Sequence, residues 1–240
     1  MSEVMTKWER RAEIRADTFI EGVVSKQETR PICLAPDSDV SRTVLKVGSG
    51  PLIDDGVICR CVDEANTLQW NEARDRALTW YHHERTDWLV QYQFCTTKSR
   101  KRPCLLEDDV AVVVRSPKDS WDPKLDYWRC SCQNEIYHMD SWMIHDDSKQ
   151  DKQFWEYRYT CDKLTCDTGE PCVRHYMDRA ASHTVGFRFL CTCPEGHYCP
   201  PSKGGKPQAY EADGHDKDIG PYIFGYCIPV PGWDRQPWTQ

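Results

Sequence analysis

The residues of this chain best suited to chemistry are its fourteen cysteines, because a thiol can form a disulfide, bind a metal or act as a nucleophile. Twelve of them repeat one pattern three times: a single cysteine, a C-x-C pair and a closing cysteine. The three units are Cys33, Cys59, Cys61 and Cys95; Cys104, Cys130, Cys132 and Cys161; and Cys172, Cys191, Cys193 and Cys227. The repeat indicates one structural module used three times. Cys166 and Cys199 lie outside this pattern.

We interpret these cysteines as disulfides that stay inside their own units, because closing a short loop costs less entropy than bridging between units. Each opening and each closing cysteine is expected to bond one member of its own C-x-C pair, and the choice between the two members stays open. Cys166 is expected to bond Cys199, which would tie the connector after the second unit to the loop at residues 200–221.

The chain is long enough for several small domains, since it has 240 residues. We expect a charged helical segment over residues 1–30, then cysteine modules over 31–97, 98–165 and 166–240, the last with an extended tail. Modules of about 65–70 residues bury too little apolar surface to be secure without disulfides. Size and cysteine spacing therefore point to the same organisation.

The predicted fold class is β-rich and disulfide-stabilised, with three tandem small antiparallel modules and minor helix. The C-x-C segments alternate polar and apolar residues, which is typical of half-buried strands. β-prone runs precede them at residues 43–47, 110–115 and 172–177, and an aromatic stretch closes each unit. Helix is expected over residues 3–22 and 63–88, while residues 200–221 are expected to form an irregular loop.

Other candidate sites fit their motifs poorly. Structural zinc sites commonly use C-x2-4-C spacing, whereas the close pairs here are C-x-C. Residues 82–87 resemble the H-E-x-x-H helix of zinc proteases but end in Asp87. Two clusters of histidine and aspartate, at residues 138–147 and 213–218, lack the order of a calcium loop. We therefore predict no catalytic residue, no metal site and no cofactor, and rank an enzyme using a His/Asp cluster last.

Charge and composition restrict the partners. A net charge of −7 argues against nucleic acid, because phosphate binding depends on lysine and arginine. No apolar run is long enough for a membrane span. The basic run at residues 98–102 is expected to be an exposed loop, and a role in binding an acidic partner stays open. The ten tryptophans serve either as core or as contact anchors, and both roles stay open.

The C-terminal third carries a resemblance. Residues 191–199, Cys-Thr-Cys-Pro-Glu-Gly-His-Tyr-Cys, are followed by residues 224–229, Phe-Gly-Tyr-Cys-Ile-Pro. This resembles the C-x-C-plus-terminal-cysteine pattern of cysteine-rich secreted arthropod proteins, including some centipede venom components. The resemblance implies secretion and disulfides. Residues 1–22 have no apolar signal core, so either a leader was removed or export does not occur.

The leading functional hypothesis is a secreted, disulfide-rich, non-enzymatic protein that binds a protein partner. It would act as a toxin, an inhibitor or an extracellular structural component. The alternative is an intracellular or assembly-bound structural protein with reduced or zinc-bound cysteines. The two differ in compartment, because stable disulfides need an oxidising environment.

Overall fold

The computed structural model describes ten stretches of the chain. They are residues 30–48, 50–62, 68–72, 75–82, 88–98, 101–105, 110–147, 152–178, 184–199 and 214–230. Within these stretches the chain forms β-strands and no helix. The β-rich, disulfide-stabilised fold class is confirmed. The helix expected over residues 3–22 lies outside the described residues.

The first unit forms two antiparallel hairpins. The strands are β1 (Val40–Val47) with β2 (Leu52–Val57), and β3 (Ala77–Tyr81) with β4 (Trp88–Phe94). The closing strand β4 also pairs with β1, which gives the order β2-β1-β4-β3. The unit is therefore a four-stranded antiparallel arrangement in which its first and last strands are neighbours.

The second unit repeats this connectivity. Its strands are β5 (Val112–Pro117), β6 (Lys124–Trp128), β7 (Ile136–Asp147) and β8 (Lys152–Thr160). Strand β5 pairs with β6 and β8, and β8 pairs with β7, so the order is β6-β5-β8-β7. Again the first strand of the unit lies beside the closing strand.

The third unit has the order β10-β9-β13-β12. Its strands are β9 (Pro171–Met177), β10 (Thr184–Phe189), β12 (Gly214–Asp216) and β13 (Gly220–Tyr226). The short strands β11 (His197–Tyr198) and β14 (Ile228–Pro229) pair in a separate two-stranded sheet. All three units thus share one strand connectivity.

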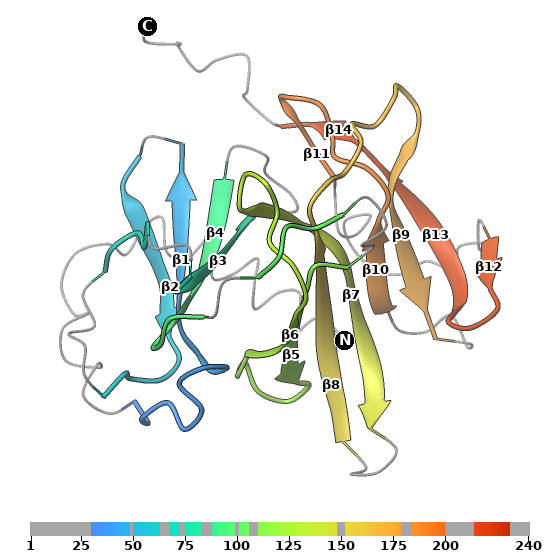
Figure 1. Cartoon of the computed structure of the whole chain (residues 1–240). Coiled ribbons are helices and arrows are strands. Elements are labelled where there is room, and N and C mark those ends of the chain that lie inside the picture. The colour runs from blue at the N-terminus through green and yellow to red at the C-terminus, as the bar shows by residue number, and fades with distance from the viewer. Residues whose placement is uncertain are drawn as a thin grey trace, which may run out of the picture. The chain divides into compact units, whose positions relative to one another are not determined.

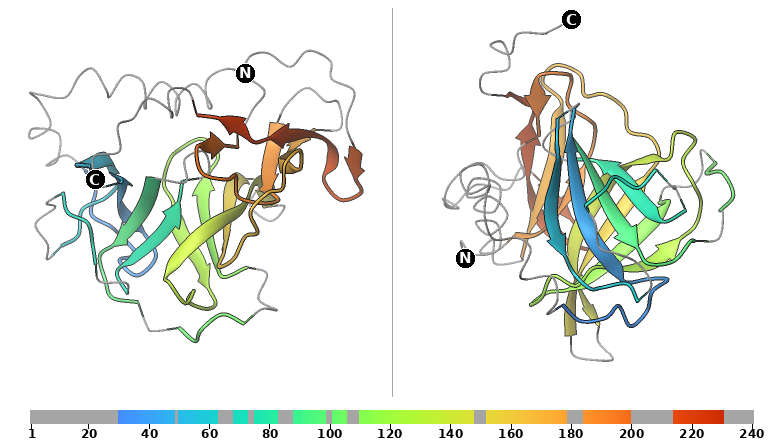
Figure 2. Two further views of the ribbon diagram at one scale, coloured as in Figure 1. Left: turned by 90° about the horizontal axis from the view of Figure 1, so that it is seen from above. Right: turned by 90° about the vertical axis from the view of Figure 1, so that its left-hand side faces the viewer.

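Strand β7 links the units into one twelve-stranded sheet. It pairs in parallel with β3 of the first unit and antiparallel with β10 of the third. Figure 1 shows β8, β7, β10 and β9 as successive neighbours, and Figure 2 gives two further views of the same strands. Backbone pairing therefore continues across the boundaries between the cysteine units.

The core lies on one face of this sheet. Because side chains alternate across a strand, residues directly opposite one another on neighbouring strands share a face. One such row runs from β5 to β9. It consists of Val114, Tyr157, Trp142, Phe187 and His175. The rings of Trp142 and Phe187 lie 4.6 Å apart, and those of Phe187 and His175 lie 4.7 Å apart. The side chains that alternate with this row point to the opposite face of the same strands.

Several local predictions need correction. Helix over residues 63–88 is wrong where the structure describes that interval, because Ala77–Tyr81 is strand β3. Its β-prone residues Thr79, Trp80 and Tyr81 pair with the closing strand, which satisfies the backbone groups without a helix. Residues 214–216 and 220–221 are strand where an irregular loop was predicted.

The C-x-C segments do not lie inside strands. Each follows a strand and makes a single isolated bridge through its middle residue, Arg60, Ser131 or Thr192. The strands predicted before the C-x-C pairs and at the aromatic closing stretches do occur, as β1, β5 and β9 and as β4, β8 and β13. Each C-x-C segment connects two hairpins. Disulfides hold it in place, because it lacks the continuous backbone hydrogen bonding of a paired strand.

Candidate binding groove

Seven disulfides join all fourteen cysteines. The pairs are Cys33–Cys59, Cys61–Cys95, Cys104–Cys130, Cys132–Cys161, Cys166–Cys191, Cys172–Cys199 and Cys193–Cys227. The opening cysteine bonds the first member of the C-x-C pair, and the closing cysteine bonds the second. Every bond stays within its unit, as expected. In the third unit Cys227 bonds a member of its C-x-C pair as predicted, whereas Cys166 and Cys172 depart from the predicted pairing.

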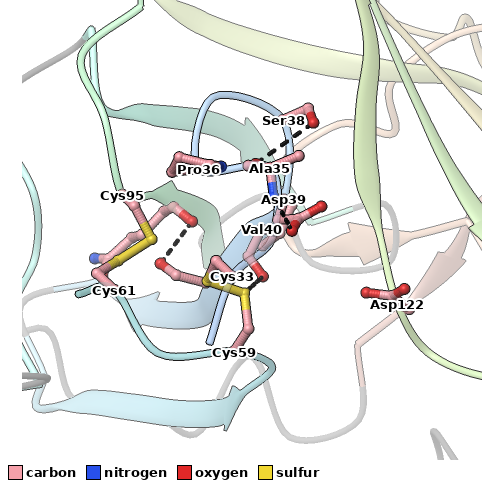
Figure 3. The surroundings of a disulfide bond; sticks show 12 residues. Cys33, Ala35, Pro36, Ser38, Asp39, Val40, Cys59, Cys61, Cys95 and Asp122 are labelled. Carbon is pink, nitrogen blue, oxygen red and sulfur yellow. Dashed lines mark hydrogen bonds between the residues drawn. A yellow bond between two sulfur atoms is a disulfide. The ribbon is translucent and has the colours of Figure 1, made fainter. Parts of the chain in front are cut away.

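One local arrangement recurs at all three C-x-C segments. The backbone N–H of the opening cysteine donates to the carbonyl of the middle residue: Cys33 to Arg60 at 3.0 Å, Cys104 to Ser131 at 3.0 Å and Cys166 to Thr192 at 2.9 Å. Figure 3 shows how the two disulfides of the first unit then lie side by side. These contacts fix which cysteine opens each unit.

The predicted bond between Cys166 and Cys199 is wrong, and so is the assignment of Cys172 as the opening cysteine. Cys166 occupies the place that Cys33 and Cys104 hold in the other units, and Cys172 bonds Cys199 instead. A signal was present in the sequence. Cys166 precedes its C-x-C pair by 24 residues, close to the 25 in the other units, whereas Cys172 precedes it by only 18.

Potential metal ligands gather at the cysteines. In the part of the chain that the structure describes, each group of three or more ligand atoms within 4.8 Å of one another consists of cysteine sulfurs, and all of these are disulfide-bonded. The histidines and aspartates of residues 138–147 are not brought together in such a group among the described residues. Residues 83–87 and Asp213 lie outside the described part.

A groove lies over the sheet face opposite the core. Residues of β8, β7, β10 and β9 line it, together with residues of the connectors next to these strands. Its volume is about 1680 Å³. Small-molecule pockets usually measure about 300–1,000 Å³, so this groove has room for a segment of a macromolecule.

A row of arginines crosses the floor of this groove. Arg158 of β8 is opposite Ser141 of β7, Ser141 is opposite Arg188 of β10, and Arg188 is opposite Arg174 of β9. The three arginines are distant in sequence and meet only because the register aligns their strands. All of them line the groove.

Arg158 contributes to a cluster of partly exposed basic side chains around the buried Glu156. Its Nε donates to Glu156 Oε1 at 2.7 Å, and Arg115 Nε donates to Glu156 Oε2 at 2.9 Å. His145 Nε2 lies 3.6 Å from the same carboxylate. Burial by itself would raise the pKa of Glu156, but the hydrogen bonds from Arg158 and Arg115 and the nearby charges outweigh it. The pKa of Glu156 is therefore lowered, and the carboxylate stays ionised.

Lys163 forms the second charged contact of the groove. Its Nζ lies 3.1 Å from Asp140 Oδ1 and also donates to the carbonyl of Phe189. Burial lowers the pKa of Lys163, and the charge of Asp140 partly opposes that shift. Because Lys163 lies between Cys161 and Cys166, this contact fastens the connector of units two and three to β7 and β10.

Arg174 and Arg188 differ from these paired groups. Neither forms an ion pair with another described residue, although they are directly opposite each other. The guanidinium of Arg174 lies 4.9 Å from the ring centroid of Tyr222 and 5.8 Å from that of Phe224. Its Nε is buried and has no hydrogen-bond partner among the described residues. Sequence reasoning missed this pair, because no local motif marks it.

The tryptophans of units one and two divide into one buried residue and six partly exposed ones. Trp80 is buried, with its ring 4.2 Å from Tyr92 and 5.2 Å from Tyr159. The other tryptophans of units one and two, at positions 70, 88, 121, 128, 142 and 155, are partly exposed.

No helix among the described residues is both long and apolar enough to cross a bilayer.

The sheet and its seven disulfides define the chain as a β-rich, disulfide-stabilised protein. No protein-family model matches the chain, and no curated protein matches its sequence. Among solved structures, the chain is similar to the crystal structure of unliganded Argos, with 18% sequence identity and a TM-score of 0.39. The match covers 85% of this chain and 94% of the Argos chain. A likeness at this level carries no argument about function.

Proposed function

We propose that this chain is an extracellular, non-enzymatic binding protein whose groove holds a protein partner. The observation that carries the proposal is the groove itself. It presents two arginines that form no ion pair with a carboxylate of the described residues, on a sheet that disulfides stabilise at every unit. Such a site holds its geometry before binding, so little entropy is lost when a partner docks.

Seven disulfides support the extracellular part of the proposal, because reducing compartments keep thiols free. By covering a surface of its partner, the chain would act as an inhibitor, a toxin or a component of an extracellular assembly. The reduced or zinc-bound alternative predicts free thiols or chelator-removable metal instead.

Two measurements test this function. Intact mass of secreted protein is expected to be lower than the reduced mass by the fourteen hydrogens of seven disulfides. The oxidised protein is then applied to an array of purified extracellular domains in a surface-binding assay. We expect saturable binding to a protein that disappears after reduction. Free thiols in the native chain, bound zinc, or no binding to any arrayed protein would count against the proposal.

A further inference from the structure

We propose that the partner docks through an extended acidic segment whose carboxylates bind Arg174 and Arg188 and whose apolar side chains pack against exposed leucines of the groove lining. This inference rests on the proposed function and specifies the chemistry of the partner.

The first argument is the position of the two arginines. Directly opposite residues on antiparallel strands have Cβ atoms about 4.5–5.5 Å apart, so the side chains of Arg174 and Arg188 start from neighbouring positions on one face of the sheet. The Arg174 guanidinium itself lies over the rings of Tyr222 and Phe224 on β13. Like charges at such positions destabilise a sheet unless a counter-ion lies between them. A carboxylate placed over this pair would neutralise both repelling groups.

The second argument is that Arg174 is prepared for an acceptor. The rings of Tyr222 and Phe224 flank its guanidinium, which restricts the side chain before any ligand arrives. Its buried Nε lacks a hydrogen-bond partner in the described part of the chain. Because that Nε is too buried to meet a ligand, an incoming carboxylate would bind the terminal Nη groups of the guanidinium, which can donate two hydrogen bonds.

The neighbouring charges leave the two arginines available. Asp140 is engaged by Lys163, and Glu156 is engaged by Arg158 and Arg115. Two further aspartates, at positions 162 and 218, line the groove, but they are exposed and form no ion pair with Arg174 or Arg188. The groove lining has four acidic side chains and, apart from His145, four basic ones. Arg174 and Arg188 are the two basic groups that form no ion pair with a described residue.

The third argument concerns two exposed leucines of the groove lining. Leu105 and Leu164 line the groove and are 55% and 84% exposed. Exposed leucines beside cationic residues favour a peptide with an apolar side chain. A sulfated polysaccharide would match the arginines but would offer no apolar side chain to either leucine.

The test uses the full oxidised chain and four labelled probes in fluorescence anisotropy. The first is a ten-residue peptide of glutamates with leucines at two positions. Its matched controls replace glutamate by glutamine, or leucine by glycine. The fourth probe is a heparin oligosaccharide. We expect the glutamate–leucine peptide to bind best, with an affinity that falls as salt rises.

Variants then assign the site. Arg174→Gln and Arg188→Gln should each weaken peptide binding by about tenfold or more, since each removes a charge-assisted contact. Arg188→Lys keeps the charge but loses the fork, so it should fall between wild type and Arg188→Gln. Arg129→Gln is the matched control, because Arg129 is exposed and does not line the groove. Thermal melts confirm that every variant is folded.

The outcomes distinguish failure of this inference from failure of the proposed function. Equal binding of the glutamine peptide, equal loss in Arg129→Gln, or arginine-dependent binding of heparin alone overturns the inference. If a protein partner is bound equally well by wild type and by both glutamine variants, the proposed function stands and only the inference fails. If neither peptide nor protein binds the oxidised chain, both fail together.

Discussion

Arg188 of β10 lies directly opposite Arg174 of β9, so two like charges are neighbours on one face of the sheet. A fold selected only for stability gains nothing from this arrangement, since opposed like charges destabilise a strand pair. We therefore expect Arg188→Gln to raise the free energy of unfolding by about 0.2–1 kcal/mol while it weakens binding. Urea denaturation at low and high salt checks this. Wild type should gain more stability from salt than the variant, and a destabilised Arg188→Gln protein would contradict the expectation.

Glu156 gives the fold a defined response to acid. Its pKa in the folded protein lies below the ordinary value of 4.5, whereas the unfolded chain has the ordinary value. Its contribution to stability is therefore present above about pH 4.5 and is lost as pH falls through the folded-state pKa. We expect Glu156→Gln to cost about 1.5–3 kcal/mol at pH 7 and to unfold less steeply with acid. Denaturation at pH 7 and pH 3 measures both effects.

The matched control for Glu156 is Glu195→Gln, because Glu195 is an exposed glutamate. It should leave the stability at pH 7 and the acid response close to those of wild type. The same acid response in wild type and Glu156→Gln would show that another carboxylate carries the effect.

Lys163 depends on Asp140 because its amino group is largely buried. Asp140→Asn leaves that charge without its counter-ion and should cost about 3 kcal/mol of unfolding free energy. The loss should lessen as pH rises, since the folded-state pKa of Lys163 already lies below its ordinary value and the neutral amine is cheaper to bury. Adding Lys163→Met should restore part of the stability. A double variant no more stable than Asp140→Asn would argue against this coupling.

The third unit carries one disulfide more than the repeat requires. Removing it with Cys172→Ser and Cys199→Ser should cost about 3–4 kcal/mol. The unit should stay folded, because Cys166–Cys191 and Cys193–Cys227 reproduce the two bridges of the other units. Circular dichroism and melting curves measure the outcome. Peptide mapping without reductant should find Cys166 linked to Cys191, and a peptide linking Cys166 to Cys199 would refute the pairing.

Trp80 joins the first unit to the second, because its ring contacts Tyr92 of β4 and Tyr159 of β8. Trp80→Ala should cost about 3–5 kcal/mol through the cavity it leaves. It should also separate the melting of the first unit from that of the others in calorimetry. Trp70→Ala is the control, since Trp70 is partly exposed and contacts Lys46. A single sharp transition in Trp80→Ala would show that backbone pairing alone couples the units.

Local patterns predicted much of this fold. The spacing of the cysteines predicted, for the first two units, that the opening and closing cysteines bond the C-x-C pair, because a disulfide joins positions whose offset reflects a fixed local geometry. It left open which member of the pair each one bonds, and the structure decides this. The aromatic closing stretches became strands since alternation and β-propensity are properties of a few neighbouring residues. The strand β3 was missed because apolar residues between Leu68 and Tyr81 fit a helical face as well as a strand.

The remaining features needed the whole molecule. Cys166 and Cys172 both stand before the third C-x-C pair, and the hydrogen bond from Cys166 to Thr192 selects between them. The groove depends even more than the disulfide pairing on contacts between segments that are distant in the sequence. Alternation fixes the face on which Arg174 or Arg188 lies within its own strand, but it does not say which strands are neighbours or in which register. The amino-acid sequence by itself determined units, strands and most bridges, whereas strand order and register, set by contacts between distant segments, placed the two arginines side by side.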